Sequence, residues 1–91
     1  EMAEAQKYLG IARLDAGDLA AARRRLRRAA ELAPADADTH FLLGESLFLQ
    51  RRYREAIASY EEAFRLNPRH GGAARRLVEA RRRLKTAGGS E

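Results

Sequence analysis

The sequence of 91 residues contains no cysteine and no tryptophan, only two histidines and two prolines, and no long apolar run. Without cysteine, the chain has no disulfide framework, no thiol nucleophile and no thiolate ligand for a metal ion. The histidines, His40 and His70, are thirty positions apart and form no metal-binding motif. No apolar run approaches the ~20 residues that a membrane-spanning helix needs, and no basic-then-apolar leader begins the chain. We therefore expect no metal, no cofactor, no membrane insertion and, by default, a cytoplasmic location.

Positive charge is in excess, with 18 lysine and arginine residues against 13 aspartate and glutamate residues. The densest cluster has five arginines within residues 23–28, and on one helix these would cover most of the circumference. No aromatic residue lies among them to stack on nucleic-acid bases. The pattern favours a solvated outer face and disfavours nucleic acid, while an acidic partner stays open as an alternative.

Apolar residues recur with the 3.6-residue period of amphipathic helices, and no segment alternates as a strand would. Glycine and proline end helices and aspartate begins them, and such signals occur at Gly17-Asp18, at Pro34 to Asp36 and at Asn67-Pro68. The turn at Arg51-Arg52 lacks a good cap. The sequence predicts an all-α fold with helices at about 3–16, 18–32, 37–50, 53–66 and 73–85, in which short turns make neighbours antiparallel. Gly71-Gly72 would separate the last helix, and residues 86–91 would form a frayed tail.

The chain repeats itself with a period of 34 residues. Residues 3–36 and 37–70 share seven identities: Ala3/Ala37, Leu9/Leu43, Gly10/Gly44, Ala22/Ala56, Ala29/Ala63, Leu32/Leu66 and Pro34/Pro68. Glycine in mid-helix costs about 1 kcal/mol relative to alanine, so we expect another helix backbone to pass close to Gly10 and Gly44. The repeated alanines predict a flat helix–helix seam, with Leu26 and Tyr60 as the large residues between them. A 34-residue helix–turn–helix period indicates a stacked helical array.

At these residues the chain resembles the tetratricopeptide repeat family. The second unit has the signature residues Leu43-Gly44, Ala56, Tyr60, Ala63 and Pro68, with Tyr53 at a further aromatic position. The first unit keeps most of them but has Leu26 in place of the aromatic residue. Both units depart at two positions, with Gln6 and His40 where tryptophan is usual and Arg13 and Leu47 where tyrosine is usual.

The resemblance implies a short right-handed α-solenoid of five helices. Its parts would be repeat 1 at residues 1–36, repeat 2 at 37–70, a C-terminal capping helix at 71–85 and a disordered tail at 86–91. The polar residues Gln6 and Arg13 favour the first helix as the N-terminal edge of the stack.

No catalytic group emerges from the residues. His40 occupies a position that the family fills with a packing aromatic residue, and the glutamates of the fourth helix lie near arginines, where ion pairing is expected. The glycines lack the spacing of a phosphate-binding loop. We do not expect an enzyme.

In the family, the first helix of each pair lines a concave groove that holds an extended peptide or a partner's helix. The resemblance therefore implies a protein–protein interaction module, an adaptor or scaffold. Its groove residues in this chain would be Lys7, Tyr8, Ile11, Leu14, Phe41, Leu42, Glu45, Phe48, Leu49, Arg75, Arg76 and Glu79, and the stripe continues at Glu4, Asp15, Asp38, Arg82 and Arg83. An apolar middle and a basic C-terminal end would suit a protein or peptide segment with apolar anchors and acidic groups.

Within this groove, we expect Phe41 and Leu49 to be exposed anchors, whereas Leu14 and Phe48 either line the groove or pack against neighbouring helices. Some family members hold a chaperone's C-terminal carboxylate on five groove positions; only Lys7 and Arg76 match here, so we do not expect that role. Two alternatives to peptide binding stay open: self-association into a homo-oligomer through the groove or an end face, and arginine-driven binding of nucleic acid or acidic surfaces.

Overall fold

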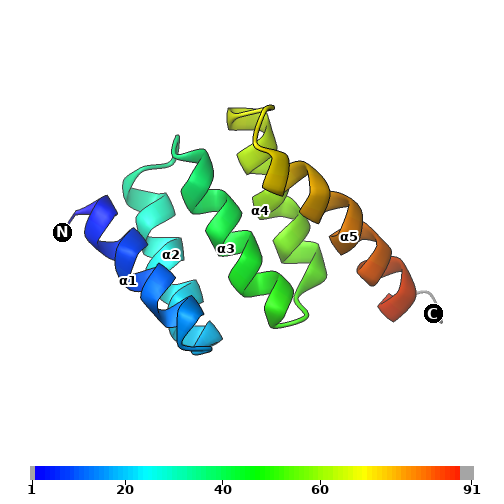
Figure 1. Ribbon diagram of the computed structural model, residues 1–91, viewed down its shortest axis with the longest axis horizontal. Coiled ribbons are helices and arrows are strands. Elements are labelled where there is room, and N and C mark those ends of the chain that lie inside the picture. The colour runs from blue at the N-terminus through cyan, green and yellow to red at the C-terminus, as the bar shows by residue number, and fades with distance from the viewer. Residues whose placement is uncertain (1, 89–91) are drawn as a thin grey trace.

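The computed structural model describes residues 2–88 of the chain, which form five helices joined by turns and no strand. In chain order they are α1 (Ala3–Asp15), α2 (Leu19–Leu32), α3 (Ala37–Leu49), α4 (Tyr53–Leu66) and α5 (Gly71–Gly88), as Figure 1 shows. Successive helices run antiparallel and pack on one another along the chain. The all-α class and the repeated helix–turn–helix arrangement are thereby confirmed.

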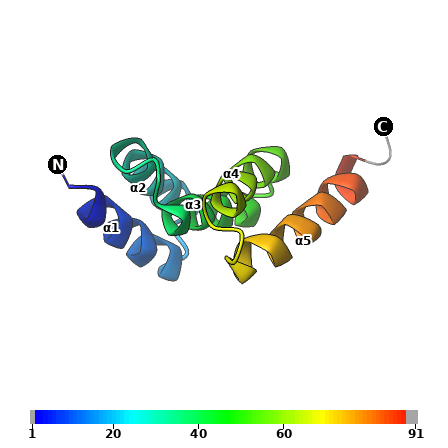
Figure 2. The same ribbon diagram turned by 90° about the horizontal axis from the view of Figure 1, so that it is seen from above.

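The helices form two layers, with α1, α3 and α5 on one side and α2 and α4 on the other (Figure 2). The molecule is elongated, with extents of 43 × 28 × 18 Å. Helices that follow one another in the chain share broad interfaces, whereas α1 and α5 each touch α3 only along an edge. No helix within residues 2–88 is long and apolar enough to cross a membrane.

The predicted caps begin two of the helices. The Asp18 carboxylate accepts a hydrogen bond from the backbone N–H of Ala21 (3.3 Å), and the Asp36 carboxylate accepts one from the N–H of Asp38 (3.1 Å). These bonds satisfy N–H groups that the first turn of a helix leaves without a backbone acceptor. The start of α4 has no side-chain cap, as the sequence predicted for the turn at Arg51-Arg52.

The fifth helix is longer than predicted. It begins at Gly71 instead of residue 73, and it continues to Gly88 instead of ending at residue 85. At its start, the ring atom Nδ1 of His70 accepts a hydrogen bond from the N–H of Ala73 (3.1 Å), which caps the first turn. Near its end, the Thr86 hydroxyl donates to the carbonyl of Arg82 (3.0 Å). The predicted tail is therefore helical as far as residue 88, and residues 89–91 lie outside the described part of the chain.

The predicted alanine seam lies in the core. Its four alanines and the two large residues between them have no exposed surface: Ala22, Leu26, Ala29, Ala56, Tyr60 and Ala63. The small size of each alanine lets the helices of a pair approach closely. The core therefore follows the repeat, with one set of these residues in each helix pair.

The reason for the two mid-helix glycines differs from the prediction. A Cβ atom at Gly10 would lie 2.5 Å from the side-chain carbon Cγ of Leu26, and one at Gly44 would lie 2.6 Å from ring atom Cε1 of Tyr60. A large side chain of the partner helix, and not its backbone, thus occupies the space that each glycine leaves.

Candidate functional site

The concave side of the α1, α3 and α5 layer brings the predicted groove residues of α3 and α5 together. An open hollow of about 520 Å³ between these two helices is lined by Phe41, Glu45, Gly72, Arg75, Arg76, Glu79 and Arg83. All but Gly72 were assigned to the groove stripe from the sequence. The residues of α1 lie in the same layer (Figure 2) but do not line this hollow.

The ring of Phe41 forms the wall between α3 and α5. Its centroid lies 4.7 Å from the His70 ring and 5.7 Å from the Tyr60 ring. A Cβ atom at Gly72 would lie 3.0 Å from Cζ of Phe41, so the glycine leaves room for the ring. Phe41 is half-buried by these neighbours and packs against the core. The ring therefore helps to hold α5 in place, in addition to facing the groove.

The other apolar groove residues differ in exposure. Phe48 is 7% exposed and packs edge-on against Tyr53 with ring centroids 5.5 Å apart, while Leu14 and Leu42 are half-buried against the core. Tyr8 and Leu49 are 63% and 52% exposed. Of the apolar residues predicted for this face, Tyr8 and Leu49 thus offer the most free surface to a partner.

A network around Glu45 joins three helices. The Arg76 guanidinium forms a two-pronged ion pair with the Glu45 carboxylate, with distances of 2.9 Å and 3.2 Å. The hydroxyl of Tyr60 on α4 donates to the same carboxylate at 2.5 Å. Burial raises the pKa of Tyr60, and the Glu45 carboxylate raises it further, so the hydroxyl keeps its proton and remains a donor. The bond geometry of Arg76 makes this residue a structural bridge between α3 and α5.

Two arginines cover the buried ring of Phe48 from the groove side. The guanidinium carbons of Arg76 and Arg83 lie 4.9 Å and 5.6 Å from its centroid, within the range of a cation–π interaction. Arg83 and Arg82 both pair with Glu79, at 2.8 Å and 3.1 Å. These contacts place the positive charges of α5 directly beside the apolar part of the groove.

The ammonium of Lys7 on α1 is also engaged within the protein. It lies 3.1 Å from the Asp36 carboxylate and 3.9 Å from that of Asp38. Burial of Asp36 favours its protonated form, but hydrogen bonds from Thr39 and Lys7 outweigh this effect and hold the pKa of Asp36 below its ordinary value. The sequence identified Lys7 as a groove residue but not its partner Asp36, which is 29 positions away and was assigned only to a cap.

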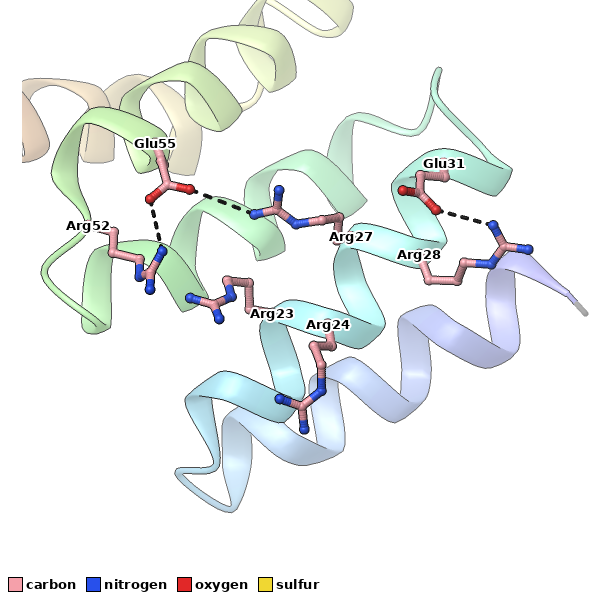
Figure 3. Close-up of a pocket in the computed structure, with 7 residues that line it drawn as sticks. All are labelled: Arg23, Arg24, Arg27, Arg28, Glu31, Arg52 and Glu55. Atoms are coloured by element: carbon pink, nitrogen blue, oxygen red, sulfur yellow. Dashed lines mark hydrogen bonds and ion pairs between the residues drawn. The ribbon is translucent and has the colours of Figure 1, made fainter.

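The outer side of the molecule carries a second hollow of about 510 Å³ between α2 and α4. It is lined by Arg23, Arg24, Arg27, Arg28, Glu31, Arg52 and Glu55. Figure 3 shows Arg27 and Arg52 converging on Glu55, at 3.9 Å and 3.2 Å, and Arg28 turned toward Glu31 at 3.2 Å. Most of these arginines therefore have partners inside the protein, which supports a solvated outer face.

A third surface lies at the α5 end of the stack. Phe64 and Val78 are 40% and 60% exposed there. An open hollow of about 470 Å³ beside them is lined by Glu61, Phe64, Arg65, Ala74, Leu77 and Arg81. Its lining is mainly apolar carbon from α4 and α5.

Among residues 2–88, no group of three histidine, cysteine, aspartate or glutamate side chains could hold a metal ion. The ring atom Nε2 of His40 lies 2.8 Å from the carbonyl oxygen of Pro34, which ties the start of α3 to the preceding turn. His40 thus has a structural role.

Comparison with known proteins matches this architecture. A family model described as a tetratricopeptide repeat matches residues 8–68 and residues 50–90. The two matches together cover most of the chain, from the middle of the first helix to the end of the last. No curated protein matches the chain.

Proposed function

The chain belongs to the tetratricopeptide repeat family, whose repeats generally mediate protein–protein interaction, and we propose that it binds a peptide or partner segment in the groove formed by α1, α3 and α5. In this role the protein is an adaptor or scaffold and not an enzyme, as is typical of the family. The observation that supports the groove is the hollow of about 520 Å³ between α3 and α5, with exposed Leu49 on the same face.

The exposed apolar residues of the groove are the proposed anchors for the partner. Burying a leucine side chain completely contributes about 1.5–3 kcal/mol relative to leaving it in water. Leu49, 52% exposed, can gain much of this on binding, whereas the half-buried Phe41 already contributes to the fold. Leu49 is therefore a better test of the groove than Phe41, because its removal leaves the core intact.

The test compares two exposed leucines. Twelve-residue peptides are first selected from a random displayed library, and the affinity of a selected peptide is measured by titration calorimetry. Leu49→Ala should weaken binding about tenfold, the equivalent of about 1.4 kcal/mol. Leu9→Ala should leave the affinity unchanged, because Leu9 is 43% exposed but projects from the opposite face of α1. Binding that depends on Leu9 and not on Leu49 would contradict the groove assignment.

Self-association is the second candidate, and exposed Phe64 and Val78 at the α5 end favour it. A contact between copies through this end would make the apparent mass rise with protein concentration. Sedimentation over a hundredfold concentration range checks this, and Val78→Glu should abolish the rise. A mass that stays monomeric throughout would reject this candidate and leave peptide binding untouched.

A further inference from the structure

We infer that the groove carries opposite charges at its two edges, and that it binds a segment in one orientation, with the basic end of the segment against α1 and its acidic end against α5. The inference rests on the proposed function and adds to it the order of charges in the partner. The sequence analysis assigned a net charge only to the basic C-terminal end of the groove, so the charge of the α1 edge is new.

The edge at α1 has a surplus of negative charge. Its charged residues are Glu4, Lys7 and Asp15 on α1, with Asp36 and Asp38 beside them at the start of α3. Asp38 also lies 2.9 Å from His70, at the start of α5. The lysine is held between two aspartates, at 3.1 Å and 3.9 Å, and offers no free positive charge to a partner. Glu4 and Asp15 are exposed and make no ion pair within residues 2–88. A basic group of a partner would therefore be attracted to this edge.

The edge at α5 has the opposite surplus. Four arginines stand against two glutamates: Arg75, Arg76, Arg82 and Arg83 against Glu45 and Glu79. Arg76 is neutralised by Glu45, whereas two arginines share Glu79. Arg75 lines the hollow, is exposed and makes no ion pair in the described part of the chain. An acidic group of a partner would find a free guanidinium here, which can bind a carboxylate with two parallel hydrogen bonds.

The two edges act separately because α3 lies between them. Packed helices are about 8–10 Å apart, so α1 and α5 are separated by about twice that distance. Exposed charges are largely screened beyond about 8 Å at physiological ionic strength. A group bound at one edge therefore responds mainly to the charges of that edge. A segment of about six extended residues, at about 3.3 Å each, spans the distance.

Apolar surface on α3 occupies the middle of this path. The ring of Phe41 lines the hollow, and Leu49 is exposed about two turns further along the same face of α3. The segment that fits has lysine or arginine at one end, apolar residues in the centre, and aspartate, glutamate or a free carboxylate at the other end. A uniformly acidic segment would have one end against the acidic residues of α1, where like charges repel.

The first experiment uses twelve-residue peptides selected from a random displayed library on the whole protein. We expect the selected peptides to have basic residues at one end and acidic residues at the other. A nitroxide label is then attached to either end of a selected peptide, and backbone amide signals of the protein are recorded by NMR. A label at the acidic end should broaden signals of α5 and spare those of α1, and a label at the basic end should do the reverse.

A pair of charge reversals provides the second experiment. Arg75→Glu should weaken binding of the selected peptide about tenfold at low salt. Arg24→Glu is the matched control, because it changes the net charge equally at an exposed residue of the outer face that has no ion pair within residues 2–88. Arg24→Glu should leave the affinity within twofold of the parent.

The outcomes separate the inference from the proposed function. Selection of uniformly acidic peptides, or equal broadening of α1 and α5 by both labels, would overturn the charge order while groove binding stands. Equal loss of affinity in the two arginine variants would also overturn it, since net charge alone would then control binding. Failure of the library to yield any peptide that binds the groove would overturn the proposed function, and the inference with it.

Discussion

At the scale of single residues, the need for glycine depends on whether a neighbouring side chain occupies the space that a Cβ atom would take. Tyr60 fills the space at Gly44, and it cannot move aside easily because it is fully buried and bonded to Glu45. At Gly71, by contrast, nothing lies within 4 Å of where a Cβ atom would stand. The same residue type is therefore required at one position and replaceable at the other.

The substitution Gly44→Ala should lower the free energy of unfolding by about 1–3 kcal/mol, as expected for overpacking of a core. This loss should appear although alanine has the higher helix propensity. The larger Gly44→Leu should be worse still. Gly71→Ala is the control and should be neutral or mildly stabilising. Chemical denaturation measures all three, and a Gly44→Ala variant as stable as the parent would contradict the packing described for Tyr60.

The two repeat turns contain a second informative pair. Arg51 has a φ angle of 62°, in the left-handed region, and Gly17 has a φ of 78° at the same position of the first repeat, 34 residues earlier. Left-handed backbone costs a non-glycine residue about 1 kcal/mol. Arg51→Gly should therefore stabilise the protein by about 0.5–1 kcal/mol, and Gly17→Arg should destabilise it by a similar amount. Thermal melts of both variants check this, and changes of the same sign would refute it.

At the scale of the helix, the start of α3 depends on the charge of Asp36. Its pKa in the folded protein is below the ordinary value of 3.8. The ionised Asp36 carboxylate therefore contributes its full stabilisation at pH values above its ordinary pKa, and this contribution is lost as the pH falls through the pKa of the folded state. Asp36→Asn keeps an acceptor at the cap but removes the charge.

We therefore expect the free energy of unfolding of Asp36→Asn to fall less than that of the parent as the pH is lowered from about 5 to 2. The variant has no carboxylate at this position, so it has no stabilisation to lose when the carboxylate of the parent becomes protonated. Its free energy of unfolding at neutral pH should be lower than that of the parent. Urea denaturation at several pH values gives both quantities. Asp15→Asn, an exposed residue without an ion pair in the described chain, serves as the control. A variant at Asp36 with the pH dependence of the parent would contradict the assigned role.

Helix boundaries show how far local sequence determines the structure. Both ends of α2, the start of α3 and the end of α4 follow from local turn and cap signals, and the predicted boundaries agree with the structure to within a residue. The start of α4 also agrees, although no side-chain cap marks it. The start of α5 does not, because its cap is the ring of His70, which Phe41 and Asp38 orient from another helix. A cap that depends on tertiary contacts cannot be recognised from neighbouring residues alone.

The charged residues of the groove show the same limit of prediction from local sequence. The family resemblance placed six of the seven residues that line the hollow on one stripe. It could not show which charges cancel, because Lys7 and Asp36 are 29 positions apart and Arg76 and Glu45 are 31 apart. The sequence therefore predicted which residues share this face but not the net charge of its α1 edge.

At the scale of the whole molecule, α3 is the central helix, and the stability of the stack depends most on its contacts. Among the described helices, it is the one that touches all four others. Six of its residues are buried, compared with Gln6 and Gly10 in α1. In a stack of repeats, stability comes from each unit and from its interfaces with neighbours.

Native-state hydrogen exchange should therefore be slowest in the amides of α3 and faster in α1 and in the last turns of α5. Exposed helices at the ends of a stack open locally at a lower free energy than the centre. NMR or mass spectrometry of the exchanging protein measures this order directly. Protection of α1 equal to that of α3 would show that the molecule opens only as a whole.

The contacts across the groove layer have a mechanical consequence. The α1 edge is tied to α3 by the ion pairs of Lys7, a half-buried one with Asp36 and a longer one with well-exposed Asp38. The α5 edge is tied by the half-buried bridge of Arg76 and by contacts of the Phe41 and Phe48 rings. Salt weakens ion pairs but not the packing of aromatic rings, so the contact between α1 and α3 should loosen more at high salt than the contact between α3 and α5. Because the chain has no cysteine, dyes on cysteines introduced in exposed turns of these helices can report each span separately. The distance between α1 and α3 should lengthen as salt is raised, and that between α3 and α5 should stay constant.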